Sequence, residues 1–128
     1  MGDTINVQGY EAAMDVVNGI TAVAYTSSSA EVLSAAIDTT AYPRKQIFVV
    51  GNHAADATST GVTLTVKESA TSGGSYTAAT KTGTFGASTS AGSWMTQVKR
   101  NPAKPFIKVS ITPAGGSGVI SATVVFIP

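Results

Sequence analysis

Hydrophobic and polar residues alternate with a period of two in two stretches of the chain, residues 62–68 and 106–112. Side chains two residues apart in a β-strand lie on the same face of a sheet, so this period is typical of a strand with one buried and one solvated face. Both stretches are therefore predicted to be strands. The residues on their buried faces are predicted to be Val62, Leu64, Val66, Ile107, Val109 and Ile111.

The last apolar stretch, residues 119–127, differs because it carries apolar and β-branched residues on both parities. A strand with two apolar faces is expected in the middle of a sheet or beneath a partner. Residues 112–118 contain one Pro and three Gly, which suit a turn because Gly accepts positive φ and Pro fixes its own φ. We predict a hairpin of residues 105–112 and 119–127, with its second strand in a central position.

Three further strands are predicted in the first hundred residues. Residues 30–38 favour a strand over a helix of barely two turns, residues 46–50 are nearly all apolar, and residues 93–100 alternate. A loop is predicted over residues 51–61. The predicted inward residues are Leu33, Ala35 and Ile37 in the first strand and Trp94, Thr96 and Val98 in the third, while Ile47 and Phe48 point to opposite faces.

The first 30 residues allow two interpretations. Val7, Tyr10, Met14 and Val17 are spaced by three and four residues, which would place them on one face of a short helix ending at Asn18 and Gly19. The alternative is an extended arm that a neighbour orders, followed by a strand over residues 20–25. We expect these four residues to form a candidate interface with a partner.

Several short strands at roughly ten-residue spacing, separated by Gly, Pro and Ser clusters, are typical of an all-β fold. The sequence therefore predicts a β-sandwich or a jelly-roll-like small barrel with an N-terminal arm. Residues 1–30 are assigned to the arm and residues 31–128 to the β-sandwich domain. A chain of 128 residues is the length of one domain.

Composition narrows the classes of partner. Only 12% of the residues are charged, the formal net charge is +1, and 43% are hydrophobic. This balance gives no electrostatic basis for binding nucleic acid or an anionic membrane, and it favours a surface that contacts another protein. The chain has no Cys, so it forms no disulfide. We find no signal-peptide pattern and no apolar run of about 18 residues, so we expect an unsecreted, soluble protein.

Catalytic motifs are not evident. His53, the single histidine, and Asp56 have the spacing of half a metal or acid-base site, but a solvated loop histidine is the favoured interpretation. Glu68 is the last residue on the predicted inward face of residues 62–68, where a buried carboxyl could serve as a general acid. An ion pair with a cation at the edge of the domain, such as Arg100, is the favoured interpretation. We therefore expect no enzyme activity, no cofactor and no metal.

The aromatic residues allow an alternative function. Trp94, Tyr76, Tyr42 and Phe85 could stack on sugars or bases, but they are scattered along the chain and lack interleaved basic residues. Packing and interface roles are favoured. The alternative is a carbohydrate-binding or adhesin-like sandwich, in which Trp94 and Tyr76 would line a groove with Asp56 or Asn52.

Five segments carry a resemblance to a known family. The order of residues 36–42, 62–69, 72–76, 106–112 and 118–125 resembles small proteins encoded near the major capsid gene of tailed bacteriophages. These are the capsid decoration, or cement, proteins. The similarity extends over roughly residues 34–127 and consists of strand and turn patterns, without chemical signatures.

The resemblance implies a structural role. A decoration protein is made in the host cytoplasm and binds the outer surface of the virion, where the major capsid protein is its partner. It is expected to be a homo-oligomer, a dimer or trimer at a capsid symmetry axis, that bridges adjacent capsomers and stabilises the capsid. The resemblance implies no active site.

Overall fold

The computed structural model describes residues 14–25, 31–55, 61–82, 92–115 and 117–128. No helix in this part of the chain is long and apolar enough to cross a membrane. A 3-10 turn, η1, spans Thr39–Ala41. The strands are β1 (Asp15–Tyr25), β2 (Val32–Leu33), β3 (Ile37–Asp38), β4 (Gln46–Ala55), β5 (Gly61–Ser69), β6 (Thr77–Ala78), β7 (Lys81–Thr82), β8 (Gly92–Val98), β9 (Phe106–Gly115) and β10 (Gly118–Ile127).

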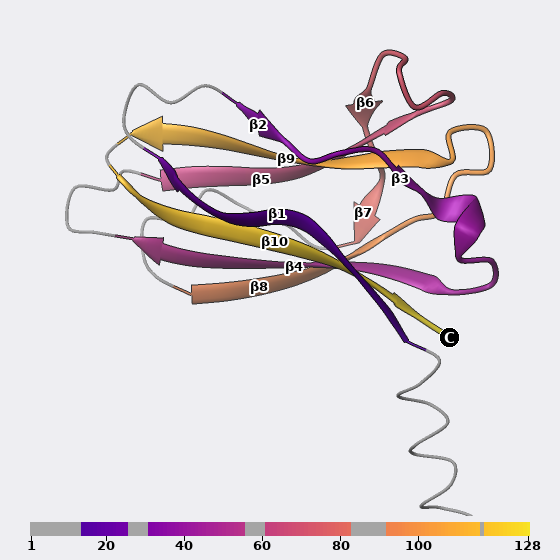
Figure 1. Cartoon of the computed structure of the whole chain (residues 1–128), viewed down its shortest axis with the longest axis horizontal. Helices are drawn as coiled ribbons and strands as arrows, with labels where there is room; N and C mark the ends of the chain where they lie inside the picture. Colours follow the sequence, from indigo (N-terminus) through magenta and orange to yellow (C-terminus); the bar gives the residue numbers. More distant parts are fainter. Residues whose placement is uncertain (1–13, 26–30, 56–60, 83–91, 116) are drawn as a thin grey trace, which may run out of the picture.

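The strands form two antiparallel sheets that pack face to face (Figure 1). Sheet A has the strand order β1-β10-β4-β8-β7. Sheet B has the order β2-β9-β5-β6, and β3 also pairs with β9. The two sheets form a sandwich and not a closed barrel, so the all-β prediction is confirmed in its sandwich form.

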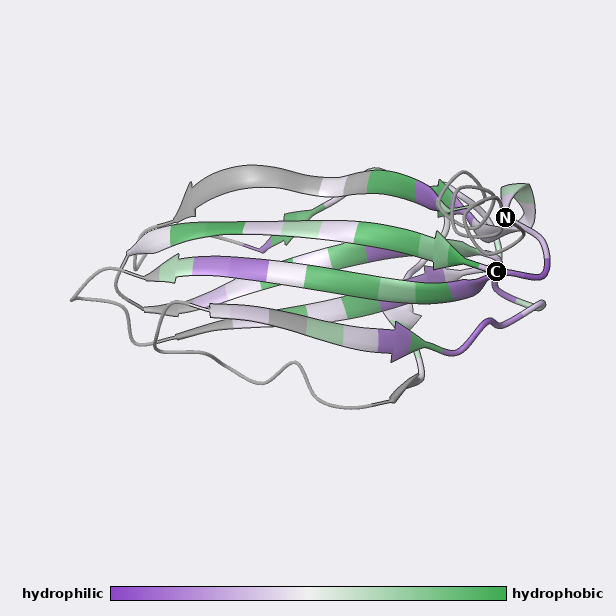
Figure 2. Cartoon of the chain, turned by 90° about the horizontal axis from the view of Figure 1, so that it is seen from below, coloured by the Kyte–Doolittle hydropathy of each residue, from purple (hydrophilic) through white to green (hydrophobic). Residues whose placement is uncertain are grey.

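The core lies between the sheets and consists of the inward residues of each strand. Figure 2 shows hydrophobic residues recurring along the strands, whereas the described connections at the end that carries the C-terminus are mainly hydrophilic. Each fully buried aliphatic or aromatic side chain contributes roughly 1.5–3 kcal/mol relative to an exposed one. The largest fully buried apolar side chains are Phe126, Ile47, Leu64, Ile111, Ile120, Val49, Val66, Val109 and Val124.

The predicted central position of the last strand is confirmed, because β10 lies between β1 and β4 in sheet A. The predicted hairpin is wrong. β9 lies in sheet B, where it pairs with β5, so the connection between β9 and β10 crosses from one sheet to the other and does not join two paired strands. Leu64, Val66, Ile107, Val109 and Ile111 are buried as predicted.

The predicted strand over residues 30–38 is wrong in its continuity and in part of its inward face. It consists of two short pieces, β2 and β3, and Leu33 is 45% exposed whereas Ile37 is buried. Ser34 separates them: its Oγ accepts a hydrogen bond from the Val109 amide and donates one to the Ala35 carbonyl, both at 2.9 Å. This local bonding shifts the inward parity by one residue before Ile37.

The structure also changes the assignment of the first 30 residues. Asp15–Tyr25 forms β1, the edge strand of sheet A, so the helical alternative does not hold there and the sandwich includes residues before 31. Gly19, the predicted helix end, lies at a register shift of β1. A Cβ atom at Gly19 would lie 3.1 Å from the Ala122 carbonyl oxygen and 3.2 Å from Val109 Cγ2, so close packing explains this glycine.

The loop predicted over residues 51–61 is shorter than expected. β4 continues through Ala55, and His53 is paired between Ile120 of β10 and Gly92 of β8. The His53 side chain is only 1% exposed, which contradicts the interpretation of a solvated loop histidine. Inward positions alternate through Val49, Gly51 and His53, so this histidine occupies a core position.

Candidate interaction surfaces

The outer face of sheet A carries hydrophobic side chains and no charge. Outward residues alternate with the core residues along β1, β10, β4 and β8, and those with described side chains include no Lys, Arg, Asp or Glu. We call this surface the uncharged face. Its apolar members are Val16, Phe48, Val50, Ala54, Met95, Val119, Val125 and Ile127.

The strand register arranges these side chains in neighbouring rows. Val16 lies opposite Val125, which lies opposite Phe48. In the next row Val50 lies opposite Met95. Polar residues follow: Ser93 lies opposite Asn52, and its Oγ donates a 3.3 Å hydrogen bond to Asn52 Oδ1. The uncharged face is therefore an apolar stripe with a neutral polar border.

Exposure makes this stripe unusual for a surface. Val16 is 63% exposed, Met95 67% and Val119 40%. Single exposed hydrophobic residues are common on soluble proteins, but a group of them on one face marks an interaction surface. The sequence signal for it was the presence of apolar residues on both faces of residues 119–127, which was interpreted as a sign of a central strand or of a strand beneath a partner.

The outer face of sheet B is polar and charged. Lys67 and Lys108 lie directly opposite each other on β5 and β9, an arrangement that is unfavourable for like charges without local partners. The Lys67 amine donates a 2.8 Å hydrogen bond to Glu31 Oε2. The Lys108 amine lies 4.6 Å from the centroid of the Tyr76 ring, in a cation–π contact. Each lysine thus has its own partner.

Glu31 provides a pH test of this arrangement. Hydrogen bonds from Lys67 and then from Ser110 hold the pKa of the Glu31 carboxyl below its ordinary value of 4.5. Because the folded-state pKa is lowered, the stabilisation is present above pH 4.5 and is lost as pH falls through the folded-state pKa. Thermal melts between pH 6 and 3 should show a small extra acid destabilisation in the wild type that Glu31→Gln lacks. Parallel melting curves would contradict this role.

A pocket of about 310 Å³ lies beside Glu68 at the end of β5 and is lined by Glu68, Thr80, Lys99, Arg100, Asn101 and Pro102. Glu68 is 7% exposed, and its Oε1 accepts a 3.1 Å hydrogen bond from Asn101 Nδ2. The predicted pairing of Glu68 with Arg100 is not found. The carboxylate has a neutral amide as its hydrogen-bond donor, and the structure supplies no acid-base partner among the described residues.

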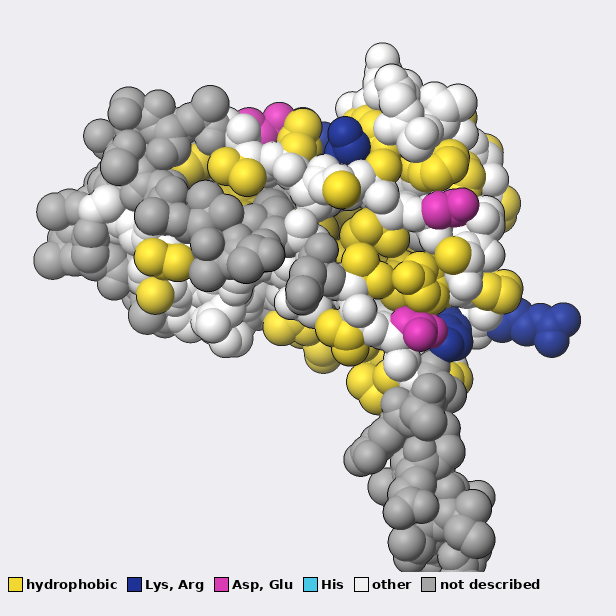
Figure 3. Space-filling model, in the orientation of Figure 1, with side chains coloured by type: hydrophobic (Ala, Val, Ile, Leu, Met, Phe, Trp, Pro, Cys, Tyr) yellow, Lys and Arg dark blue, Asp and Glu magenta, His cyan; other side chains and the backbone are white. Residues whose placement is uncertain are grey.

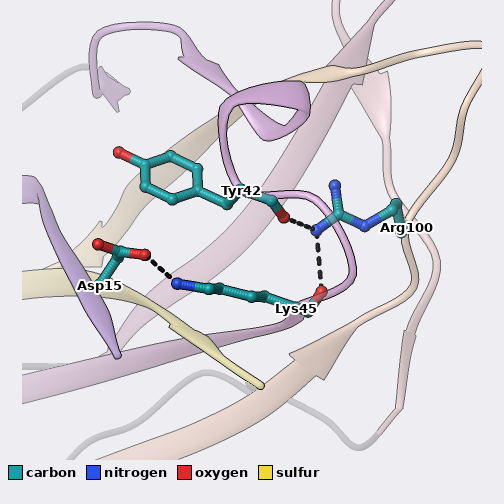
Figure 4. Close-up of polar contacts among 4 residues, drawn as sticks. All are labelled: Asp15, Tyr42, Lys45 and Arg100. Carbon is teal, nitrogen blue, oxygen red and sulfur yellow. Dashed lines mark hydrogen bonds and ion pairs between the residues drawn. The ribbon is translucent and has the colours of Figure 1, made fainter. Parts of the chain in front are cut away.

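Arg100 instead binds the segment between β3 and β4, residues 39–45. Its guanidinium donates to the carbonyl oxygens of Thr39, Tyr42 and Lys45 at 2.7, 2.7 and 2.8 Å, and Figure 4 shows the last two bonds. The Lys45 amine also forms an ion pair with Asp15 at the start of β1 (Figure 4). The Arg100 side chain thereby supplies hydrogen-bond donors to three carbonyl oxygens in a segment that is not part of a β-sheet.

The predicted aromatic groove is not assembled by the described residues. Trp94 belongs to β8 in sheet A, whereas Tyr76 precedes β6 in sheet B, where its hydroxyl donates to the Ser72 carbonyl at 2.8 Å. Tyr42 packs on Phe126 with ring centroids 4.0 Å apart. Phe85 and Asp56 lie outside the described residues. Within the described residues, no three His, Cys, Asp or Glu side chains form a possible metal site.

The structure uses the predicted interface residues in different ways. Val17 is partly buried and packs against the core of its own domain. Met14 is half-exposed at the start of β1. Val7 and Tyr10 lie outside the described residues. Val16, the neighbour of Val17 on the opposite face, presents the exposed side chain that the predicted helical spacing missed.

Comparisons with known proteins relate this chain to others by fold. No family model matches the chain, and no curated protein matches it. Among solved structures it is similar to PirA, with a TM-score of 0.50 and 9% sequence identity over 88% of this chain and 95% of PirA.

Two further solved structures match at lower TM-scores. A protein from disulfide-linked pili of Bacillus endospore appendages has a TM-score of 0.41 and 16% identity, over 89% of each chain. A protein of infectious bursal disease virus, Gx strain, has a TM-score of 0.44 and 14% identity, over 89% of this chain and 32% of the viral one. At these identities the likenesses concern the fold alone, which is an antiparallel β-sandwich.

Proposed function

We propose that this protein is a non-enzymatic structural protein that binds the outer surface of a bacteriophage head and bridges adjacent capsomers. The observation that carries the proposal is the uncharged face, with Val16, Met95 and Val119 exposed on one side of a sandwich. The resemblance of the strand and turn pattern to decoration proteins supports the assignment to a phage head. The major capsid protein is the proposed partner.

The uncharged face is proposed as the contact between copies of this protein. A two-fold contact brings the same surface of two copies together, so a face without charge avoids opposing like charges. A standard interface buries about 1,600 Å² in total and ranges widely in strength. An oligomer that contacts several capsomers at once gains affinity from each additional contact. Bridging of this kind requires no catalytic residue.

Charged substitutions on the uncharged face test the oligomer. Met95→Lys and Val16→Asp should each weaken self-association by roughly a hundredfold, because an unpaired charge in an interface costs about 3 kcal/mol or more. Both side chains point to solvent within one subunit, so the melting temperature of the subunit should change little. Sedimentation equilibrium measures association, and Thr65→Lys on the outer face of sheet B is the matched control.

Two outcomes would contradict this assignment. Wild-type protein that remains monomeric at every concentration would remove the self-contact, and equal weakening by Thr65→Lys would mean that the face has no special role. Binding to the head is measured separately, by co-sedimentation with phage heads that lack this protein. Absence of wild-type binding there would remove the proposed function itself.

A further inference from the structure

The basic residues of this chain are concentrated at one end of the sandwich. The chain contains eight Lys and Arg residues in total. They lie at the start of β4, the end of β5, in β7, after β8 and around the start of β9, and these strand ends meet because β4–β8 and β5–β9 are antiparallel pairs. On the face drawn in Figure 3, the Lys and Arg side chains occupy the half of the molecule that includes this end.

This end, which we call the basic end, consists of the turn before β4, the turn between β5 and β6 and the segment between β8 and β9. Its cations outnumber the carboxylates around them, because the described residues include all eight basic residues but four carboxylates, Asp15, Glu31, Asp38 and Glu68. The opposite ends of the same strands contribute no Lys or Arg. Within the described part of the chain, the basic residues are therefore concentrated at one end of the strands.

Several of these cations have internal partners. Lys45 pairs with Asp15 and Lys67 with Glu31, and Arg100 donates to three carbonyl oxygens. Arg44 and Lys99, by contrast, are both exposed. Arg44 lies in the turn before β4 and Lys99 directly follows β8, and these two strand ends are neighbours because Ile47 of β4 pairs with Val98 of β8. These two cations face solvent where the sheet ends.

The backbone at Arg44 supplies a second, independent observation. Arg44 has φ of 62° and is the non-Gly residue with positive φ in the described structure. It follows Pro43 in a tight turn, a position at which Gly or Asn is the usual choice, and a left-handed conformation costs a residue with a Cβ roughly 1–2 kcal/mol. Arg44 is therefore an exposed cation at a turn position where glycine would fit with less strain.

We propose that the basic end docks onto an acidic protein surface, with Arg44 and Lys99 as its principal contacts. This inference rests on the proposed function, in which the acidic surface belongs to the exterior of the phage head. It assigns the two ends of the subunit different roles, because the uncharged face contacts other copies while the basic end contacts the capsid. A partner of opposite charge is recognised through long-range attraction and direct ion pairs.

A protein surface fits this end better than a nucleic acid does. Carboxylates are interspersed with the cations, since Glu68 lines the same pocket as Lys99 and Asp38 precedes η1 near the Arg44 turn. A uniform phosphate backbone would be repelled by those carboxylates, whereas a protein surface can place its acidic groups selectively. Tyr76, the aromatic residue of the adjoining turn, already has the Lys108 amine over its ring, 4.6 Å from the centroid, and this contact would compete with base stacking on that ring face.

The test uses the full-length protein and phage heads that lack it. Arg44→Gly removes the charge and the backbone strain together, so it should retain the wild-type melting temperature while lowering head affinity. The double variant with Arg44→Gly and Lys99→Gln should bind heads about five- to tenfold more weakly than wild type. Raising NaCl from about 0.05 to 0.5 M should weaken head binding by wild type about tenfold and head binding by the double variant much less. Lys67→Gln removes the same charge from an internally paired site and is the matched control.

The outcomes separate this inference from the proposed function. Wild-type binding that resists salt, or an equal loss in Lys67→Gln, would overturn the docking role of the basic end and leave the head-binding function standing. Absence of wild-type binding to heads would overturn the proposed function. The same variants would then be compared on a poly-L-glutamate surface. Equal affinity of Arg44→Gly and wild type for that surface would overturn the inference as well. Tighter binding to duplex DNA than to poly-L-glutamate would also overturn it.

Discussion

Replacing Phe126 with alanine is expected to lower the free energy of unfolding by roughly 3–5 kcal/mol. Phe126 has no exposed surface and lies in β10, the strand between β1 and β4. Its ring stacks on Tyr42 at a centroid distance of 4.0 Å and an interplanar angle of 15°, so truncation removes buried area and this aromatic contact together. Urea denaturation followed by tryptophan fluorescence and circular dichroism measures the loss.

Val125→Ala is the control for Phe126→Ala. Val125 is the preceding residue of the same strand, but it points to the uncharged face and is only half-buried. Val125→Ala should lower the free energy of unfolding much less than Phe126→Ala, because a partly exposed side chain contributes less hydrophobic stabilisation than a fully buried one. Equal losses at the two positions would mean that the inward and outward faces of β10 are assigned wrongly.

Arg100→Gln should lower the free energy of unfolding by about 2–3 kcal/mol, the second-largest loss of subunit stability that we expect. The substitution removes the guanidinium that donates hydrogen bonds to the carbonyl oxygens of Thr39, Tyr42 and Lys45. Hydrogen bonds to a charged group contribute about 1.5–3 kcal/mol in favourable cases. Solvent will rehydrate part of this half-buried site, which limits the loss. Chemical denaturation measures it.

The neighbouring Lys99→Gln is the matched control for Arg100→Gln. Lys99 is exposed, so its substitution should change stability by less than about 0.5 kcal/mol. Amide hydrogen exchange adds a local readout, because loss of Arg100 should accelerate exchange in residues 39–45 before the sheets open. Unchanged exchange in that turn would show that Arg100 does not hold it.

The parts of the fold that alternation determines could be predicted from the sequence. In Leu64–Val66 and Ile107–Ile111 every second residue is apolar, and a register shift would expose the whole set, so one arrangement is strongly favoured. The two-sided apolar character of β10 likewise indicated its central position. These signals are local, and a single sequence contains them completely.

The remaining features depend on contacts between distant segments. Ser34 breaks its strand because it bonds Val109, 75 residues away, and nothing near Ser34 indicates that partner. Arg100 was expected to pair with Glu68, but three carbonyl oxygens of a distant turn use it instead. His53 was interpreted as a loop residue because it falls within the loop predicted over residues 51–61. Asn52, Ala54 and Ala55 have weak strand propensity, but pairing with the neighbouring strands β8 and β10 overrides that preference.

The candidate surfaces were only partly accessible to sequence reasoning. Low charge indicated a partner surface, but its location was assigned to Val7, Tyr10, Met14 and Val17. Val16 and Met95 lie 79 positions apart in the sequence (95 − 16), and only the order β1-β10-β4-β8 places them on one face. The basic end likewise requires knowledge of which strand ends meet, because its cations are dispersed from Arg44 to Lys108.

The central position of β10 has a consequence for biosynthesis. β1 and β4 are the first long strands to leave the ribosome, yet in sheet A they pair with β10 and not with each other. Sheet A therefore cannot assemble until β10 has left the ribosome, and pairing across such long sequence separations is slow. A nascent chain should remain protease-sensitive until that point, so the uncharged face forms only when β10 is available to complete the core.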